Sequence, residues 1–164
     1  MGKIPEHWGL RRLKFLGKIK TGEKDTVDNE EHGKYPFFVR SDTVEKINTY
    51  SYDEEAVLTA GDGAGVGKVF HYINGKFEYH QRVYKVSKFQ NILGKFIFYY
   101  MKINLYSEVI KISAKSTVDS LRLPMLLNFP VAYPPIEDQN KIVKFLDQKT
   151  EKIDRAIAHK ERLI

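Results

Sequence analysis

Residues 136–164, IEDQNKIVKFLDQKTEKIDRAIAHKERLI, decide the fold class of this chain. No glycine or proline interrupts the stretch, and its acidic first turn, Glu137 and Asp138, suits the dipole of a helix. The pattern predicts one helix of roughly 40 Å, at about 1.5 Å per residue. A small domain cannot cover that length, so we expect the distal part to project and pack against a partner helix, as coiled-coil segments do. The apolar stripe consists of Ile142, Phe145, Leu146, Ile153, Ala156, Ile157, Leu163 and Ile164.

The residues before this helix have the short periodic patterns of strands. Residues 20–34 are polar and predict a loop, whereas residues 91–104 have helical spacing with Asn91 as the expected N-cap. We therefore expect an α+β fold, in which a twisted, mainly antiparallel β-rich domain over residues 1–135 precedes the long C-terminal helix over residues 136–164. The strand patterns cover residues 8–16 with one irregularity, 35–39, 56–60, 66–72, and 76–87 with a bulge near Gln81.

The glycine-rich stretch LTAGDGAGVGKVFHY, residues 58–72, has the glycine content of a phosphate-binding loop. A P-loop would need glycine where Asp62 stands and Ser or Thr where Val69 stands. The residues after the glycines are β-branched and aromatic, whereas nucleotide-binding motifs need a helix to begin there. The stretch therefore predicts a strand, a glycine turn and a second strand, and it argues against a nucleotide-dependent enzyme. The glycines serve either a tight hairpin or the close approach of a polynucleotide backbone.

Composition bounds the remaining function classes. The chain has 27 basic and 21 acidic residues, a net charge of +6 and a pI near 9.3, which is compatible with a nucleic-acid partner without requiring one. There is no cysteine, and therefore neither a disulfide nor thiol chemistry. No apolar run has the length of a membrane span or the form of a signal peptide, so we expect a cytoplasmic protein without membrane contact. The histidines show no metal-ligand spacing and no catalytic set stands out, so we expect no metal, no cofactor and no catalytic residue.

Both ends of the chain resemble one known family. The tail has the order Pro-Pro, acidic residue-Gln, Leu-Asp and Ile-Asp, and the N-terminal residues 4–22 read IPEHWGLRRLKFLGKIKTG. Together with the glycine hairpin, this order is similar to the specificity (S) subunit of type I restriction–modification enzymes. That family usually has Glu where Asp138 stands, a conservative difference that affects only a contact at the start of the helix. The matching tail residues are Pro134, Pro135, Asp138, Gln139, Leu146, Asp147, Ile153 and Asp154.

The resemblance implies a non-catalytic, sequence-specific DNA-binding protein. Residues 1–135 would form one target-recognition domain, which reads one half of a bipartite double-stranded DNA site, and residues 136–164 would form part of a spacer helix. The chain would be a half-subunit or a fragment of a longer one, a view that the uncapped end of the helix pattern also favours. Its implied partners are the methyltransferase (M) subunits, the restriction (R) subunit through the complex, and a second recognition half or a second copy through the spacer helix. The implied contact residues are Pro134, Pro135, Gln139, Leu146, Ile153 and Ile157.

Several loops carry side chains suited to DNA. Base edges need Arg, Lys, Asn or Gln, and phosphates need cations, hydroxyls or backbone N–H groups. Alternatives stay open for several of them. Arg40 could instead be an ion-pair partner, and Ser116 and Thr117 could cap a turn. Only one of Gln81 and Arg82 is expected to face DNA, because neighbouring side chains alternate in a strand. The candidates are Lys20, Thr21, Lys24, Arg40, Ser41, Asp62, Lys68, His80, Gln81, Arg82, Ser116 and Thr117.

A different class of function remains in competition. The long helix would serve equally well in an assembly module related to S subunits that binds other subunits but no DNA. The loop side chains distinguish the two hypotheses, because they would have no task in a scaffold.

Overall fold

The computed structural model describes residues 3–112 and 120–162. Within these ranges, a six-stranded sheet has the order β2-β7-β5-β6-β3-β4, and β1 and β8 form a separate two-stranded ribbon. Neighbouring strands are antiparallel except for β3 and β6, which run parallel. The strands are β1 (Gly9–Arg12), β2 (Lys18–Thr21), β3 (Tyr35–Phe38), β4 (Glu45–Ile47), β5 (Tyr52–Ala60), β6 (Phe70–Tyr79), β7 (Val83–Ser87) and β8 (Pro130–Tyr133).

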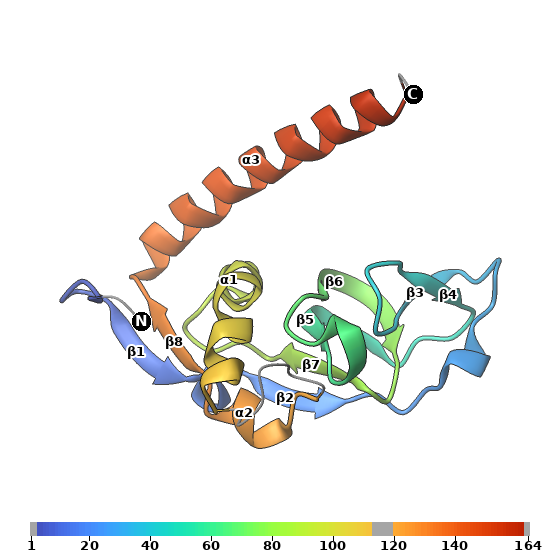
Figure 1. Ribbon diagram of the computed structural model, residues 1–164, viewed down its shortest axis with the longest axis horizontal. Helices are drawn as coiled ribbons and strands as arrows, with labels where there is room; N and C mark the ends of the chain where they lie inside the picture. The colour runs from blue at the N-terminus through green and yellow to red at the C-terminus, as the bar shows by residue number, and fades with distance from the viewer. Residues whose placement is uncertain (1–2, 113–119, 163–164) are drawn as a thin grey trace.

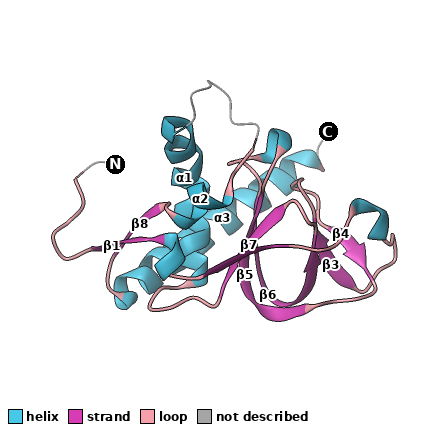
Figure 2. Ribbon diagram, turned by 90° about the horizontal axis from the view of Figure 1, so that it is seen from below, coloured by secondary structure: helices cyan, strands magenta, loops and turns pink. Residues whose placement is uncertain are grey.

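Three α-helices and three short 3₁₀ helices accompany the strands in the described ranges. The ribbon β1–β8 and the helices α1 and α2 lie toward one end of the molecule, and β3 and β4 lie at the other (Figures 1 and 2). The expected α+β architecture with a twisted, mainly antiparallel sheet and a long C-terminal helix is confirmed. The helices are η1 (Leu13–Phe15), η2 (Thr26–Asp28), η3 (Gly63–Gly65), α1 (Gly94–Ile112), α2 (Leu123–Leu127) and α3 (Ile136–Glu161).

The sheet has apolar side chains on both faces. One face of β5 and β7, including Val57 and Val86, packs with α1 residues such as Phe96, Ile97 and Met101 in the largest core cluster. The other face holds a smaller cluster that contains Leu58, Phe77, Tyr79 and Val83. Burial on both faces explains why the end of β5 reads as a continuous apolar run instead of an alternating one.

The glycine-rich stretch is a hairpin connection, as expected. Strand β5 ends at Ala60, η3 occupies the turn, and β6 returns antiparallel with Thr59 opposite Phe70, so the second strand begins at residue 70 and not at 66 as expected. Gly67 has φ +68°, and a Cβ there would lie 2.7 Å from the ring of Tyr106 on α1. This glycine is therefore required by conformation and by close packing on the helix.

Three local expectations were wrong. Residues 76–87 are not one bulged strand: β6 ends at Tyr79, a turn follows, and β7 begins at Val83. The irregularity in residues 8–16 is a change of element, from β1 to the 3₁₀ helix η1. The helix expected over residues 91–104 begins at Gly94 and extends to Ile112, and Asn91 has the left-handed φ of 57°, which a residue in the extended N-cap conformation does not adopt.

The C-terminal helix α3 begins where the prolines end. Pro135 is its N-cap residue, and its 26 residues span about 39 Å at about 1.5 Å per residue. Gln139, which is 1% exposed, accepts a hydrogen bond from the backbone N–H of Leu93 and donates one to the carbonyl of Pro134 (both 2.9 Å). Further along, Asp147 accepts hydrogen bonds from Lys95 and Tyr99 of α1. These contacts attach the first half of α3 to α1.

The second half of α3 leaves the domain. All its residues from Gln148 to Glu161 are exposed, and Figure 1 shows the helix projecting beyond the sheet. Ile153 and Ile157 are 58% and 50% exposed. They lie on the same helix face as the half-buried Ile142 and Leu146, which belong to the part of α3 beside α1. Among the described residues, no helix is both long and apolar enough to cross a membrane.

Candidate nucleic-acid interface

A pocket of about 310 Å³ opens where the ends of several strands meet. It lies beyond the C-terminal ends of β3 and β5 and beside the turn between β6 and β7. We call it the loop pocket. Its lining residues are Thr26, Val39, Arg40, Ser41, Glu45, Asp62, Gly63, Ala64, Gly65 and His80.

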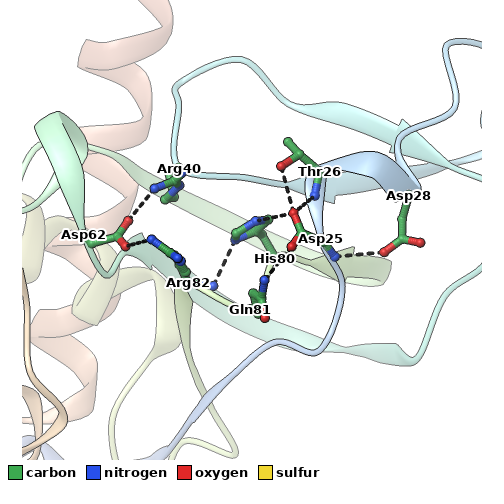
Figure 3. A network of polar contacts seen from close by, with 8 residues as sticks. All are labelled: Asp25, Thr26, Asp28, Arg40, Asp62, His80, Gln81 and Arg82. Atoms are coloured by element: carbon green, nitrogen blue, oxygen red, sulfur yellow. Dashed lines mark hydrogen bonds and ion pairs between the residues drawn. The ribbon is translucent and has the colours of Figure 1, made fainter.

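Two arginines share one carboxylate at this pocket. Arg40 Nη1 lies 2.7 Å from Asp62 Oδ1, and Arg82 Nη1 lies 2.9 Å from Asp62 Oδ2 (Figure 3). The arginine side chains are 43% and 60% exposed, whereas that of Asp62 is 25% exposed. We call this group the Arg–Asp–Arg bridge. Both guanidinium groups are thus more exposed to solvent than the carboxylate that they bind.

The charge state of Asp62 follows from this geometry. Partial burial raises the pKa of the carboxyl, but the hydrogen bonds and positive charges of Arg40 and Arg82 outweigh burial, so the pKa lies below its ordinary value. Asp62 is therefore an anion at neutral pH, and the bridge as a whole carries one net positive charge.

Glycines bring the three parts of the bridge together. The N–H of Gly61 donates to the carbonyl of Arg82 at 2.8 Å, and a Cβ at Gly61 would lie 2.8 Å from that same oxygen. A Cβ at Gly65 would lie 2.6 Å from the carbonyl oxygen of Arg40. Side chains at these two positions would push the glycine turn away from the backbone of both arginines. The glycines thus serve close packing within the protein.

A second group of contacts supports the turn that carries Arg82. His80 is 3% exposed, and its Nδ1 accepts a hydrogen bond from the N–H of Arg82 at 2.9 Å. The ring proton therefore lies on Nε2, which is 3.5 Å from Asp25 Oδ1. Asp25 also accepts from Gln81 Nε2 at 2.6 Å (Figure 3).

Asp25 is itself held by the start of η2. It forms a capping box with Asp28, and it accepts hydrogen bonds from the backbone and side chain of Thr26. The backbone N–H of Thr26 is the main cause of a lowered pKa at Asp25, followed by the Thr26 hydroxyl. His80 and Asp25 thus connect the turn of Arg82 to η2.

The structure brings together about half of the site residues expected from sequence. The loop pocket is lined by Arg40, Ser41, Asp62 and His80, and Arg82 is linked to it by an ion pair with Asp62. Gln81 and Arg82 both have exposed side chains because they lie in a turn, so the expected inward orientation of one of them is wrong. The inward-facing neighbour is His80.

The other candidates lie elsewhere or play backbone roles. Lys24 and Thr21 accept hydrogen bonds through their carbonyl groups, from Gln81 N–H and the Tyr79 hydroxyl. Lys68 is exposed at the end of the glycine turn, and Lys20 lies on β2 opposite Lys85. Ser116 and Thr117 lie outside the described residues.

A second, lysine-rich pocket was missed by sequence reasoning. Its volume is about 350 Å³, and it opens on the face of β2, β5 and β7 that is turned away from α1. The strand VYKVS places Lys85 on the same face as the buried Val83, and this alternation was the available signal. The lining residues are Lys18, Lys20, Ser51, Tyr52, Asp53, Glu54, Lys85, Ser87 and Lys88.

The residues expected to contact partners fall into two groups. Pro134 and Gln139 are buried in the junction between α1 and α3, and Leu146 is half-buried. Pro135, Ile153 and Ile157 are exposed. The accessible part of this set therefore lies mainly on the projecting half of α3.

The described residues thus form a β-rich domain with a polar pocket at its strand ends, joined to a projecting helix. The chain matches the family described as the type I restriction modification DNA specificity domain over residues 5–162. It therefore belongs to that family, as the resemblance in its sequence indicated.

Individual relatives agree with this assignment. The chain is 29% identical over 162 residues to the type I restriction enzyme EcoDI specificity subunit of Escherichia coli, covering 99% of this chain and 35% of the relative. It is 25% identical over 157 residues to the type I restriction enzyme MjaVIII specificity subunit of Methanocaldococcus jannaschii, covering 88% of this chain and 36% of the relative. The chain thus spans about a third of the length of these relatives.

Solved structures share the fold. The S subunit of the type I restriction–modification system of M. genitalium superposes with a TM-score of 0.73 at 18% identity, over 94% of this chain and 41% of the other. The HsdS subunit of Thermoanaerobacter tengcongensis superposes with a TM-score of 0.65 at 16% identity, over 94% of this chain and 40% of the other. A further structure, described as concerning complex assembly and conformational transition of the type I R-M system, superposes with a TM-score of 0.68 at 20% identity, over 94% of this chain and 41% of the other.

Proposed function

We propose that this chain is a non-catalytic recognition half of a type I restriction–modification specificity subunit. In this role, residues 1–135 read one half of a bipartite double-stranded DNA site and residues 136–164 act as a spacer helix. The observation that carries the proposal is the Arg–Asp–Arg bridge, which presents two accessible guanidinium groups around Asp62, a residue that lines the loop pocket. Arginine is the side chain best suited to reading base edges in the major groove.

The architecture supports a division of labour between the two parts. The bridge is built from the end of β3, the glycine turn and the β6–β7 turn, all within the β-rich part of the chain. The apolar stripe of α3 continues past α1 through Ile153 and Ile157 into solvent. Exposed apolar residues at helical spacing favour a second helix as the partner, either from the second recognition half or from another copy.

The methyltransferase and restriction subunits are the further partners in this proposal. A type I specificity subunit contributes target recognition, and the adenine methyltransferase and nuclease chemistry resides in the M and R subunits. The lysine-rich pocket adds positively charged side chains, Lys18 and Lys20, that suit backbone phosphates.

The proposal is tested in the assembled complex with the M subunit. Duplex affinity and the genomic methylation pattern are compared between the wild-type chain and the double variant Arg40→Ala/Arg82→Ala. We expect the variant to lose about 1–3 kcal/mol of discrimination for each bidentate arginine–base pair and to methylate a relaxed set of sites.

A matched control removes two positive charges elsewhere. Arg11 on β1 and Lys102 on α1 are exposed and lie on the part of the molecule away from β3 and β4. The control Arg11→Ala/Lys102→Ala should keep the methylation pattern. If the arginine variant also keeps both pattern and affinity, the competing assembly-module function is favoured.

A further inference from the structure

The two arginines of the bridge approach Asp62 in the same way. Each donates from Nη1 to a different oxygen of the carboxylate. Within the described residues, neither guanidinium has another hydrogen bond or ion pair. Most of the N–H donors of each planar guanidinium group therefore remain available at an exposed surface.

The backbone around Asp62 is held by contacts to two other segments of the chain. Asp62 forms a backbone bridge with Ser120, and the neighbouring Gly61 accepts from the N–H of Leu121 and donates to the carbonyl of Arg82. The carboxylate therefore extends from a constrained backbone, and each guanidinium bound to it loses rotational freedom before any ligand arrives. Pre-organisation of this kind lowers the entropy cost of binding and favours one ligand geometry over others.

The same carboxylate disfavours one class of ligand. A phosphate oxygen that contacted either guanidinium would lie close to the Asp62 anion, and one bound to Arg40 would share the loop pocket with the Glu45 carboxyl. Like charges at such distances repel each other. A neutral acceptor avoids this repulsion, and base edges in the major groove provide neutral acceptors.

Among the base edges, guanine matches a fixed guanidinium best. Guanine presents two acceptors, N7 and O6, in the major groove, whereas adenine presents an acceptor beside an amino donor, and thymine an acceptor beside a methyl group. The approach to the bridge is bordered by Gly63 and Ala64, which are exposed and small, and a Cβ at Gly63 would meet nothing within 4 Å.

We propose that Asp62 is a specificity-determining positioning residue, which holds Arg40 and Arg82 to read guanine and prevents them from acting as phosphate contacts. This inference rests on the proposed function, and it names the base that the bridge recognises. Asp62 itself does not touch the DNA in this arrangement. It acts through the two arginines.

The experiment uses the complex with the M subunit and the variant Asp62→Ala. Removal of the carboxylate frees both arginines and adds one net positive charge. Affinity for duplex without the target site should therefore rise, and the log–log salt dependence should steepen by about 0.9 for each arginine that turns to a phosphate. Discrimination against single substitutions at the guanine position should fall about 10-fold or more. A side chain with a purely structural role would not raise non-specific binding while lowering discrimination.

Two further variants keep the test independent of folding defects. Asp62→Asn retains one acceptor oxygen, so it should hold one arginine and give intermediate discrimination. Asp62→Glu retains the charge and should keep the low non-specific affinity. All variants are first compared with the wild type by circular dichroism and thermal unfolding.

The outcomes separate this inference from the proposed function. If the wild-type complex shows no sequence-specific DNA binding, the proposed function fails and this inference fails with it. If the wild-type complex is specific but its half-site lacks a G·C pair, or Asp62→Ala leaves discrimination and salt dependence unchanged, the proposed function stands and the role of Asp62 is overturned. A rise in non-specific affinity together with loss of discrimination at guanine supports it.

Discussion

Lys85 carries its ammonium group into the interior of the sheet, where the residue is 3% exposed. Its Nζ lies 2.5 Å from Glu54 Oε1 and 3.5 Å from the centre of the Tyr52 ring. Burial lowers the pKa of Lys85, and the Glu54 carboxylate opposes that change without reversing it. Glu54 also binds the exposed Lys88 at 2.7 Å, so one carboxylate serves an inner and an outer cation.

Removal of the Glu54 carboxylate should therefore lower the free energy of unfolding, because the Lys85 ammonium group is buried. We expect Glu54→Gln to lower the free energy of unfolding by about 3 kcal/mol, because a buried ammonium group loses its counter-charge. The double variant Glu54→Gln/Lys85→Met should recover most of that loss, since no buried charge remains. Chemical denaturation measures both values. Lys88→Gln is the control and should cost less than about 1 kcal/mol, because that pair is exposed to solvent on one side.

Asp62 should also make folding stability depend on pH. Its pKa is lowered in the folded state from the ordinary value of 3.8, as is that of Glu54 from 4.5, so both groups bind protons less readily when folded. Their contribution to stability is present at neutral pH and is lost as the pH falls from these ordinary values through the lowered ones.

The corresponding measurement is the free energy of unfolding of wild type and Asp62→Asn as a function of pH. We expect the wild type to lose stability steadily below about pH 4 and the variant to lose less over the same interval, because one of the two carboxylates with a lowered pKa is absent. Parallel curves for the two proteins would show that the arginine contacts do not contribute to folding stability.

At the scale of elements, α3 has two halves with different surroundings. The first half is attached to α1 by Gln139 and by Asp147, which accepts from Lys95 Nζ at 2.8 Å and from the Tyr99 hydroxyl at 2.6 Å. The second half has exposed apolar residues, and it contacts α1 at its start, where Thr150 Oγ1 lies 3.5 Å from the Tyr99 hydroxyl. The attachment sets the direction in which the helix leaves the recognition domain.

Association through the projecting half can be tested directly. We expect Ile153→Lys/Ile157→Lys to prevent self-association or assembly with the second half, because charged side chains replace the apolar stripe that a partner helix would bury. Analytical ultracentrifugation measures the assembly state. The control Gln148→Lys/Glu151→Lys places two lysines on the opposite side of the helix, where it also removes the Glu151–Arg155 ion pair, and it should assemble normally. Unfolding of the recognition domain should be unchanged in both, and equal assembly of both variants would contradict the coiled-coil role.

At the scale of the whole molecule, the proposed function assigns different contributions to the β-rich part and to the helix. The chain spans about a third of the length of its curated relatives, and it presents one loop pocket. On the proposed function, the isolated chain should bind duplex weakly, since it reads half of a bipartite site without the subunits that enclose the DNA. Affinity should fall with salt, with a log–log slope of about −0.9 per phosphate contact.

Fluorescence anisotropy at several salt concentrations measures this behaviour. Addition of the M subunit should raise the affinity and make it specific for the target site. Equal affinity with and without that subunit would mean that the chain alone forms the complete binding surface. If the affinity for duplex did not change with salt concentration, phosphate contacts would have no part in binding.

The sequence by itself determined the elements whose signals are local. The uninterrupted stretch after Pro135 is enough to predict α3, because helical periodicity and the absence of glycine and proline act within one segment. The glycine turn between two strands follows from residue types in the same way. The family was also recognisable in the sequence, because its motifs keep their order along the chain.

Only the tertiary structure decided the features that depend on distant segments. Arg40, Asp62 and Arg82 meet because β3 pairs in parallel with β6 and the glycine turn packs onto two other backbone segments. Residues 76–87 form two strands because β7 pairs with β5 and β2, and residue alternation cannot distinguish a bulge from a turn. The burial of Lys85 likewise follows from the position of its strand between these neighbours. The order of strands in the sheet and the contacts between distant side chains depend on pairings between residues far apart in sequence, and local propensity does not encode them.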